Sequence, residues 1–169
     1  GHSTILTGTR PARNGIIANN WFEPGIARAD KRVYCSEDTR DAASTSREPV
    51  VSAQFLKVPT LGEYMKAAAP GTRNVAVSAK DRAVVMMGGH KIDAGYWYKG
   101  GSFVTFKGQT LSPAAQAANA ALAKQIAAGA PALAVPAWCG VRDRAVTVGK
   151  GTVGTGKFAL EPNKPEVFR

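Results

Sequence analysis

The stretch from Asn74 to Arg82, which reads NVAVSAKDR, predicts a short strand that ends in three charged residues. Val75 and Val77 are β-branched and stand among small residues, a pattern typical of a buried strand. In open α/β sheets the ligand crevice lies beyond the carboxyl ends of the strands, so Lys80 and Arg82 would stand where a substrate binds. A compact ammonium and a planar guanidinium together suit a phosphate or a carboxylate. A solvated strand end is the alternative, and the local sequence alone favours it, because charged residues commonly follow strands.

Two segments show the spacing and the end signals of helices. The first begins with the capping-box pattern of Thr60–Glu63 and ends before Pro70. We expect its apolar face to pack on a sheet, and that face consists of Leu61, Tyr64, Met65 and Ala68. The second helix is alanine-rich, covers 113–128 and ends at Gly129. Because the first helix leads directly into the strand at Asn74, the two form half of a parallel crossover unit, and the sequence predicts an α/β fold.

Shorter elements are expected in the remaining segments. Residues 3–8 predict one or two turns of helix, which a turn at 10–15 follows. Residues 23–48 show little periodicity and indicate a long surface loop. Aromatic and β-branched residues on both sides of two glycines predict a hairpin over 96–106. The glycine-rich stretch 146–158 favours short strands or an extended flap before a proline-rich tail.

Composition limits the classes of function that the chain can have. Its 169 residues suit one domain, and 44% hydrophobic with 20% charged residues is typical of a globular protein. The formal net charge of +10 favours anionic partners such as phosphate esters, nucleic acid or a membrane surface. The basic residues are scattered, which weakens the nucleic-acid interpretation. No apolar run approaches membrane-spanning length, so we expect no membrane partner.

The glycine-rich segment imitates two nucleotide-binding motifs. Gly149, Gly151 and Gly154 match G-x-G-x-x-G, but the motif needs a helix next, and the chain continues into a proline-rich tail. The run that ends at Lys157 resembles a phosphate-binding loop, but Phe158 stands where Ser or Thr must bind magnesium. We reject both matches.

Cysteine and histidine give little direct indication of chemistry. Cys35 and Cys139 are equally compatible with one disulfide and with free thiols. His2 and His90 are far apart in sequence, and a self-contained catalytic zinc site needs three protein ligands. We therefore expect no metal site within this chain, and we expect His90 to form hydrogen bonds in a turn.

Several separated blocks of the chain form a recognisable set. They are Gly1–Gly8, Pro11, Gly15–Asn19, Trp21, Tyr34–Asp38, Lys80–Arg82 and Gly89–Tyr98. Together they resemble the monoesterase branch of the alkaline phosphatase superfamily. That branch comprises the bacterial zinc alkaline phosphatases with a threonine nucleophile, which are close to the nucleotide pyrophosphatases and phosphodiesterases. The resemblance covers about the first 110 residues and is weak from Leu111 onward.

The resemblance implies roles for particular residues. Asn19 matches the asparagine that donates to a phosphate oxygen, with Asn20 as the fallback if the register slips. Lys80 and Arg82 match the pair that contacts the phosphate in the monoesterases and that the diesterases lack. The threonine nucleophile would lie just upstream of Gly1, so this chain would hold no catalytic residue and no metal ligand. By itself it would be inactive.

The same resemblance implies an architecture, cofactors and a location. We expect a fragment of a three-layer α/β sandwich with a largely parallel sheet, in which 1–110 form the core segment and 111–169 part of an inserted cap. Two zinc ions, with room for an accessory Ca or Mg ion, would be bound mostly by residues outside this chain. The enzyme would be periplasmic or secreted and would act on phosphate monoesters. The rival hypotheses are a phosphodiesterase or nucleotide pyrophosphatase of the same superfamily, a basic nucleic-acid-binding module without catalysis, and a purely structural domain.

Overall fold

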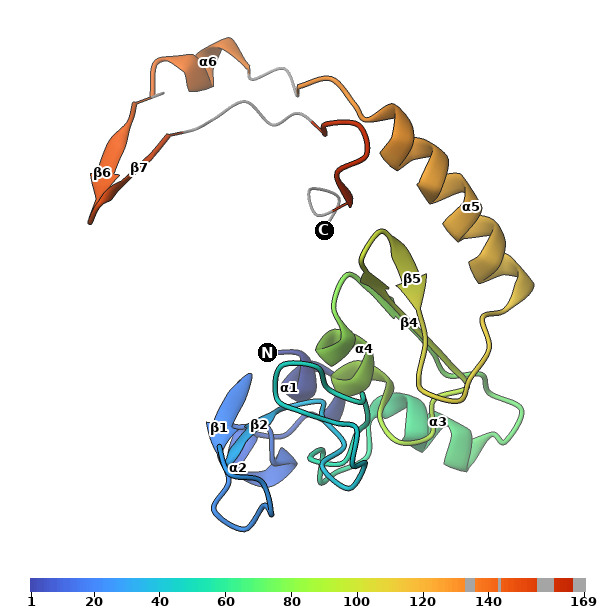
Figure 1. Ribbon diagram of the computed structural model, residues 1–169. Coiled ribbons are helices and arrows are strands. Elements are labelled where there is room, and N and C mark those ends of the chain that lie inside the picture. The colour runs from blue at the N-terminus through green and yellow to red at the C-terminus, as the bar shows by residue number, and fades with distance from the viewer. Residues whose placement is uncertain (133–135, 143, 155–159, 166–169) are drawn as a thin grey trace.

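Helices and strands are interspersed through the first two thirds of the chain, and they alternate from α3 to β4, as the α/β prediction requires. The structure is a computed structural model that describes residues 1–132, 136–142, 144–154 and 160–165. Figure 1 shows an N-terminal body and an arm that the longest helix carries away from it. The body contains α1 (His2–Thr7), α2 (Pro11–Asn14), β1 (Asn20–Phe22), β2 (Arg32–Tyr34), α3 (Leu61–Ala68), β3 (Val75–Ser78), α4 (Asp81–Gly88), β4 (Ala94–Lys99) and β5 (Ser102–Val104). The arm contains α5 (Pro113–Ala128), α6 (Ala137–Gly140), β6 (Val146–Val148) and β7 (Gly151–Val153).

The main sheet has the strand order β3-β4-β5. Strands β3 and β4 are parallel, with Val77 opposite Tyr96, and α4 connects them, so these three elements form a complete β-α-β unit. Strand β5 returns antiparallel to β4 with Tyr98 opposite Phe103. The tight turn between them needs positive φ angles, which Gly100 and Gly101 supply at 59° and 97°. The predicted α/β class and the predicted hairpin are both confirmed.

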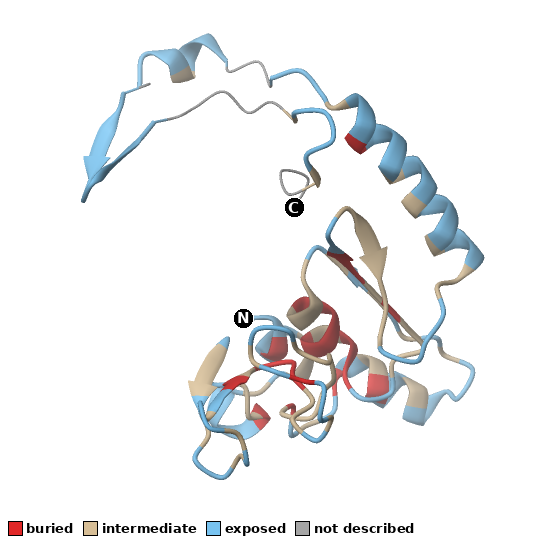
Figure 2. Ribbon diagram, viewed as in Figure 1, coloured by how far each residue is buried: buried red, intermediate tan, exposed pale blue. Residues whose placement is uncertain are grey.

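The centre of the body is α4, a helix that the sequence analysis did not predict. Its residues Ala83, Val84, Val85 and Met86 are all buried. Val85 and Met86 form one hydrophobic cluster with Cys35 and Leu56. Figure 2 shows this concentration of buried residues around α4, in contrast to the largely exposed arm.

Two predictions about packing are wrong. Val75 and Val77 lie in a strand as expected, but they are 55% and 62% exposed, because no element of the described chain covers the face of β3 to which they point. The face of α3 that carries Leu61, Tyr64 and Met65 is also about half exposed or more. Helix α3 is instead fixed by its first turn, where the buried Glu63 carboxylate accepts the Thr60 backbone N–H at 2.8 Å in the predicted capping box.

The segment 23–48 is not a simple surface loop. It contains β2, and its middle is among the most buried parts of the body, with Val33 and Glu37 both at 0% exposure. The segment is buried because β2 pairs antiparallel with β1 and because the buried Glu37 carboxylate organises the turn that follows β2.

The alanine-rich helix is confirmed as α5, with Ser112 Oγ accepting the N–H of Ala115 and Gly129 at the end. Asn119 joins it to β5 because its amide nitrogen donates to the Phe103 carbonyl at 2.8 Å and its oxygen accepts the Phe103 N–H at 2.7 Å. Beyond it, β6 and β7 form an antiparallel hairpin with Gly149 in the turn, so that glycine does not begin a nucleotide-binding helix. The rest of the predicted flap, 155–158, lies outside the described residues.

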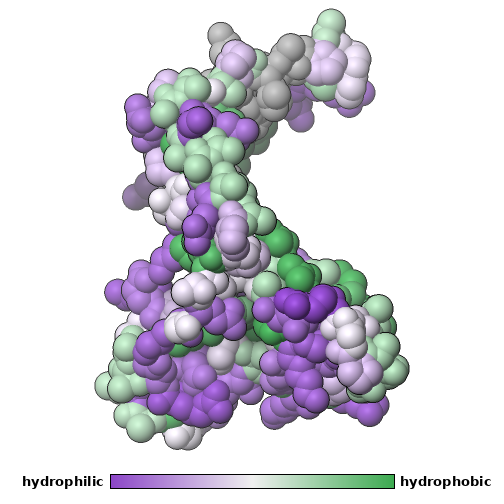
Figure 3. Space-filling model, turned by 90° about the vertical axis from the view of Figure 1, so that its right-hand side faces the viewer, coloured by the Kyte–Doolittle hydropathy of each residue, from purple (hydrophilic) through white to green (hydrophobic). Residues whose placement is uncertain are grey.

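Hydrophilic and hydrophobic residues are also unevenly distributed over the surface of the molecule. Figure 3 shows hydrophilic residues over much of the body and hydrophobic residues gathered where the body meets the arm. Within the described ranges, no helix has the length and apolar character needed to cross a membrane.

Candidate functional site

The junction of β3 and α4 places three charged residues at the carboxyl end of a parallel strand. Lys80 is the N-cap residue of α4 and has extended backbone angles, while Asp81 and Arg82 form the first turn of the helix. An acidic residue is favourable in the first turn because the helix dipole is positive there. All three side chains are partly buried. The edge that the sequence predicted as a binding site is therefore a strand-to-helix junction.

Lys80 and Arg82 line one cavity of about 900 Å³. The cavity lies between the segment 46–51, the β3–α4 junction and the β4–β5 hairpin. Its charged lining has an excess of positive charge, as five cations face two carboxylates. The cations are Arg47, Lys80, Arg82, Lys99 and Lys107, and the carboxylates belong to Glu48 and Asp81.

A tyrosine from β2 connects the charged residues of the junction. The Tyr34 hydroxyl donates to Asp81 Oδ1 at 2.7 Å and accepts from Arg82 Nη1 at 3.3 Å. Asp81 Oδ1 also accepts the Arg82 backbone N–H at 2.7 Å. Burial raises the pKa of Tyr34 to about 12, and the hydrogen bond to Tyr34 raises the pKa of Arg82 further above its usual value. The tyrosine therefore stays protonated and the arginine stays charged.

Asn19 is placed less directly than the two cations. It is exposed, it precedes β1, and it is absent from the described residues that line the cavity. Its carbonyl oxygen accepts the Cys35 N–H at 2.9 Å, next to the Asn20–Tyr34 pair of the β1–β2 ladder. The structure thus brings Lys80 and Arg82 together, and it connects Asn19 to them through the strand that carries Tyr34.

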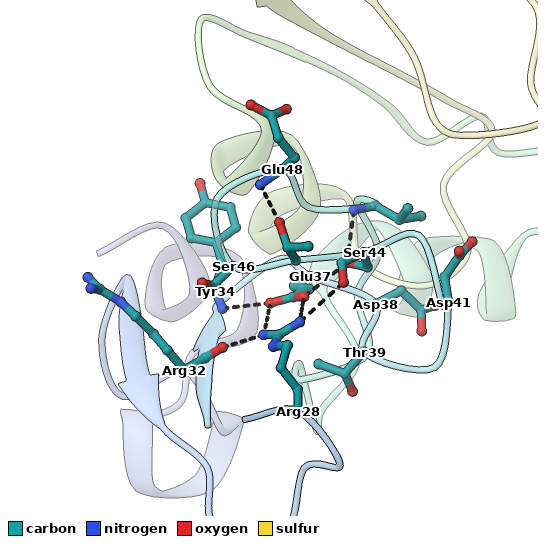
Figure 4. A network of polar contacts seen from close by, with 12 residues as sticks. Arg28, Arg32, Tyr34, Glu37, Asp38, Thr39, Asp41, Ser44, Ser46 and Glu48 are labelled. Atoms are coloured by element: carbon teal, nitrogen blue, oxygen red, sulfur yellow. Dashed lines mark hydrogen bonds and ion pairs between the residues drawn. The ribbon is translucent and has the colours of Figure 1, made fainter. Parts of the chain in front are cut away.

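A buried carboxylate holds the segment that carries Tyr34 (Figure 4). Glu37 accepts from Arg28 Nη1 at 2.5 Å and from Nη2 at 3.1 Å, from the Ser44 hydroxyl at 3.0 Å and from the Tyr34 N–H at 3.1 Å. Burial acts to raise the pKa of Glu37, but the hydrogen bonds from Arg28, Tyr34 and Ser44 outweigh it, and the pKa is lowered overall. We call this group of four residues the Glu37 cluster.

His90 and the two cysteines have structural surroundings that bear on their expected roles. His90 Nε2 lies 2.8 Å from the Leu56 carbonyl and Nδ1 lies 3.3 Å from Glu63, so the expected hydrogen-bonding role is confirmed. Cys35 and Cys139 are free thiols. Burial raises the pKa of Cys35 to about 11, which makes it a poor nucleophile.

Two residues that connect the site, Tyr34 and Asp81, were not predicted from the sequence. Both stand in blocks that carry the family resemblance, but neither was given a role. Their contact spans 47 positions in the sequence, and spacing alone does not predict it.

Comparison with known proteins now adds a family to this geometry. Residues 1–144 match the family model of type I phosphodiesterases / nucleotide pyrophosphatases, and the chain belongs to that family. Within it the chain is similar to alkaline phosphatases: it is 47% identical to alkaline phosphatase PhoK of Sphingomonas sp over 170 residues, which cover the whole chain and 30% of PhoK.

Two further comparisons agree. Over 106 residues, or 62% of the chain, it is 50% identical to alkaline phosphatase PhoD of Zymomonas mobilis and spans 18% of that protein. The crystal structure of wild-type alkaline phosphatase PafA superimposes with a TM-score of 0.65 and 26% identity, covering 80% of this chain and 27% of that one. The recognised family and the α/β fold are thereby confirmed. The chain spans less than a third of the length of each of these relatives.

Proposed function

We propose that the protein of which this chain is a part hydrolyses phosphate monoesters as an alkaline phosphatase, and that this chain supplies the phosphate-binding residues Asn19, Lys80 and Arg82. The observation that carries the proposal is the shared cavity of Lys80 and Arg82 at the β3–α4 junction, in a chain similar to alkaline phosphatases. The phosphate monoester is the substrate, and the remaining segments of the same enzyme are the partners of this chain.

Charge explains why these two residues suit a monoester. A monoester dianion carries one more negative charge than a diester, and charge-assisted hydrogen bonds from an added Lys and Arg favour it where water is partly excluded. Arg82 can donate from several N–H groups, only one of which is directed to Tyr34. Lys80 adds a compact charge at the start of α4.

The zinc ions and the threonine nucleophile of this proposal rest on the family resemblance alone. Within the described parts of the chain no group of three His, Cys, Asp or Glu side chains is placed to hold a metal ion. The described residues therefore do not fit a two-zinc site or an accessory Ca or Mg site, and we derive no step through a metal. What this chain would do is bind, orient and neutralise the phosphoryl group.

The location and the division of the chain belong to the same proposal. We place the enzyme in the periplasm or outside the cell, and we assign residues 1–110 to the core and 111–169 to an inserted cap. The expectation that the 169-residue chain is inactive by itself stays a prediction.

A second candidate is hydrolysis of phosphodiesters. The name of the matching family model favours it, since it describes phosphodiesterases and nucleotide pyrophosphatases. Lys80 and Arg82 argue against it, because a diester has no second anionic oxygen to match them.

The test compares p-nitrophenyl phosphate with bis(p-nitrophenyl) phosphate as substrates of the full-length protein. We expect a higher kcat/KM for the monoester, and a loss of about 100-fold for Lys80→Ala or Arg82→Ala. The matched controls are Lys91→Ala and Arg73→Ala, two exposed residues outside the cavity lining, which should leave kcat/KM unchanged. A preference for the diester, or equal losses in variants and controls, would overturn the proposal.

Asn19 needs its own comparison because it does not line the cavity. Asn19→Ala should lower kcat/KM for the monoester, while Asn20→Ala should have the smaller effect. The reverse order would move the role to Asn20.

A further inference from the structure

Arg82 is held by two residues that line the cavity with it, its side chain by Tyr34 and its backbone by Asp81. Its Nη1 donates to the Tyr34 hydroxyl, and that hydroxyl donates in turn to Asp81 Oδ1. Asp81 Oδ1 also accepts the Arg82 backbone N–H. Tyr34 and Asp81 therefore fix both the backbone and the guanidinium of Arg82.

Backbone hydrogen bonds of Tyr34 and of its neighbour Cys35 connect this part of the cavity to Glu37 and to Asn19. Tyr34 stands opposite Asn20 at the end of β2, and the next residue, Cys35, donates its N–H to the Asn19 carbonyl at 2.9 Å. The Tyr34 N–H donates to Glu37, which is 0% exposed and paired with Arg28. A buried ion pair therefore fixes the strand on which Tyr34 stands.

We propose that Tyr34 is a positioning residue, which holds the Arg82 guanidinium in place for the phosphate and fixes its position relative to Asn19. This inference rests on the proposed function. A flexible arginine loses rotamer entropy when it binds a ligand, and a residue that orders it beforehand reduces this loss. Without the hydroxyl, the Arg82 guanidinium could pair directly with Asp81 and turn away from the substrate.

Tyr34 acts through Arg82 and not as a nucleophile. Its hydroxyl proton is directed to Asp81, and burial holds the tyrosine in its protonated form at ordinary pH. A lone pair of the same oxygen accepts from Arg82 Nη1.

A double-mutant cycle on the full-length enzyme tests the inference. With p-nitrophenyl phosphate as substrate, Tyr34→Phe should lower kcat/KM by about 10-fold, in line with the loss of a hydrogen bond to a charged group. In an Arg82→Ala background the same substitution should change kcat/KM by less than about two-fold, because the group that it positions is gone. In the wild-type background, Tyr34→Phe should lower kcat/KM for bis(p-nitrophenyl) phosphate by a smaller factor than kcat/KM for the monoester. The control is Tyr64→Phe, which removes the same hydroxyl from a side chain that is 60% exposed on α3.

The outcomes separate this inference from the proposed function. Equal losses in both backgrounds, or no loss in either, would overturn the role of Tyr34 while leaving the enzyme a phosphatase. A wild-type protein without monoesterase activity would overturn both. If Tyr34→Phe lowers the melting temperature strongly, Asp81→Asn replaces it in the cycle, and here too a loss that persists without Arg82 would contradict the inference.

Discussion

Lys107 Nζ lies 2.5 Å from a carboxylate oxygen of Asp41, and this ion pair joins two segments that are 66 residues apart in the sequence. Lys107 also lines the cavity, so the pair lies between the cavity wall and the loop around Asp41. A second pair, Lys99 with Glu48 at 3.3 Å, connects the β4–β5 hairpin to the same region. The wall of the cavity is thus held by ion pairs as well as by packing.

These pairs should add little to stability because water reaches them. The Lys107 side chain is 61% exposed, and exposed pairs contribute about 1 kcal/mol or less. We expect Lys107→Gln to lower the free energy of unfolding by less than about 1 kcal/mol in urea denaturation. Lys124→Gln, on the exposed side of α5, is the control, and a difference of several kcal/mol between the two would contradict this prediction.

The Glu37 cluster, in contrast to the exposed pairs, should contribute strongly to the stability of the protein. Glu37→Gln keeps the shape of the side chain but removes the buried carboxylate that pairs with Arg28, which is only 21% exposed and keeps an ion pair with the half-exposed Asp30. We expect a loss of about 3 kcal/mol in the free energy of unfolding. Asp38→Asn is the matched control, since its partner Arg40 is 71% exposed, and it should cost less than about 1 kcal/mol. Equal losses would mean that burial does not set the strength of these pairs.

The lowered pKa of Glu37 predicts how the stability of the protein falls at acidic pH. The pKa of Glu37 in the folded protein lies below its ordinary value of 4.5, so the folded state binds its proton less readily than the unfolded state does. Its contribution is complete above about pH 4.5 and is lost as the pH falls through the lower, folded-state pKa. Urea midpoints measured from neutral to acidic pH should fall less steeply for Glu37→Gln than for wild type. Glu48→Gln, at a side chain that is 79% exposed, should leave the slope unchanged.

Gly89 should tolerate no side chain. Its φ angle is 74°, and a Cβ built there would lie 2.1 Å from Glu63 Oε2, which belongs to the capping box of α3. We expect Gly89→Ala to cost about 3 kcal/mol, the sum of backbone strain and a displaced buried carboxylate. Gly108→Ala isolates the backbone part, because Gly108 has a similar φ angle of 81° and no atom within 4 Å of its Cβ position. Gly108→Ala should lower the free energy of unfolding by about 1 kcal/mol. A loss as large as that of Gly89→Ala would mean that the clash with Glu63 does not contribute.

The two cysteines should differ in reactivity. Cys35 is 1% exposed and burial raises its pKa to about 11, whereas Cys139 is partly exposed. Iodoacetamide at about pH 8 should label Cys139 in the native protein and Cys35 only after unfolding, as measured by mass spectrometry of the two peptides. Rapid native labelling of Cys35 would contradict its burial.

The elements that the sequence predicts well are those with local end signals. The helices α3 and α5 have a capping box or an N-cap serine, and the turn of the hairpin has two adjacent glycines. Helix α4 was missed because Val84 and Val85 are β-branched and follow directly on a strand-like segment. The burial of Glu37 was missed because it depends on Arg28, and no local pattern links the two residues.

In the candidate site, too, the residues with a local sequence signal were predicted and the contact between distant segments was not. Lys80 and Arg82 follow one strand, so a rule about strand ends was sufficient to place them at a binding edge. Tyr34 comes from another strand and meets Arg82 only after the chain has folded. Contacts between distant segments of this kind are visible only in three dimensions.

The uncovered strand β3 has a consequence for handling the chain alone. Within the described ranges no strand pairs with its outer edge, which lies beside two exposed valines, and such edges recruit strands from other molecules. The net charge of +10 keeps separate copies apart by mutual repulsion, and added electrolyte screens that repulsion. The isolated 169-residue polypeptide should therefore remain dispersed in dilute buffer and precipitate as the salt concentration rises.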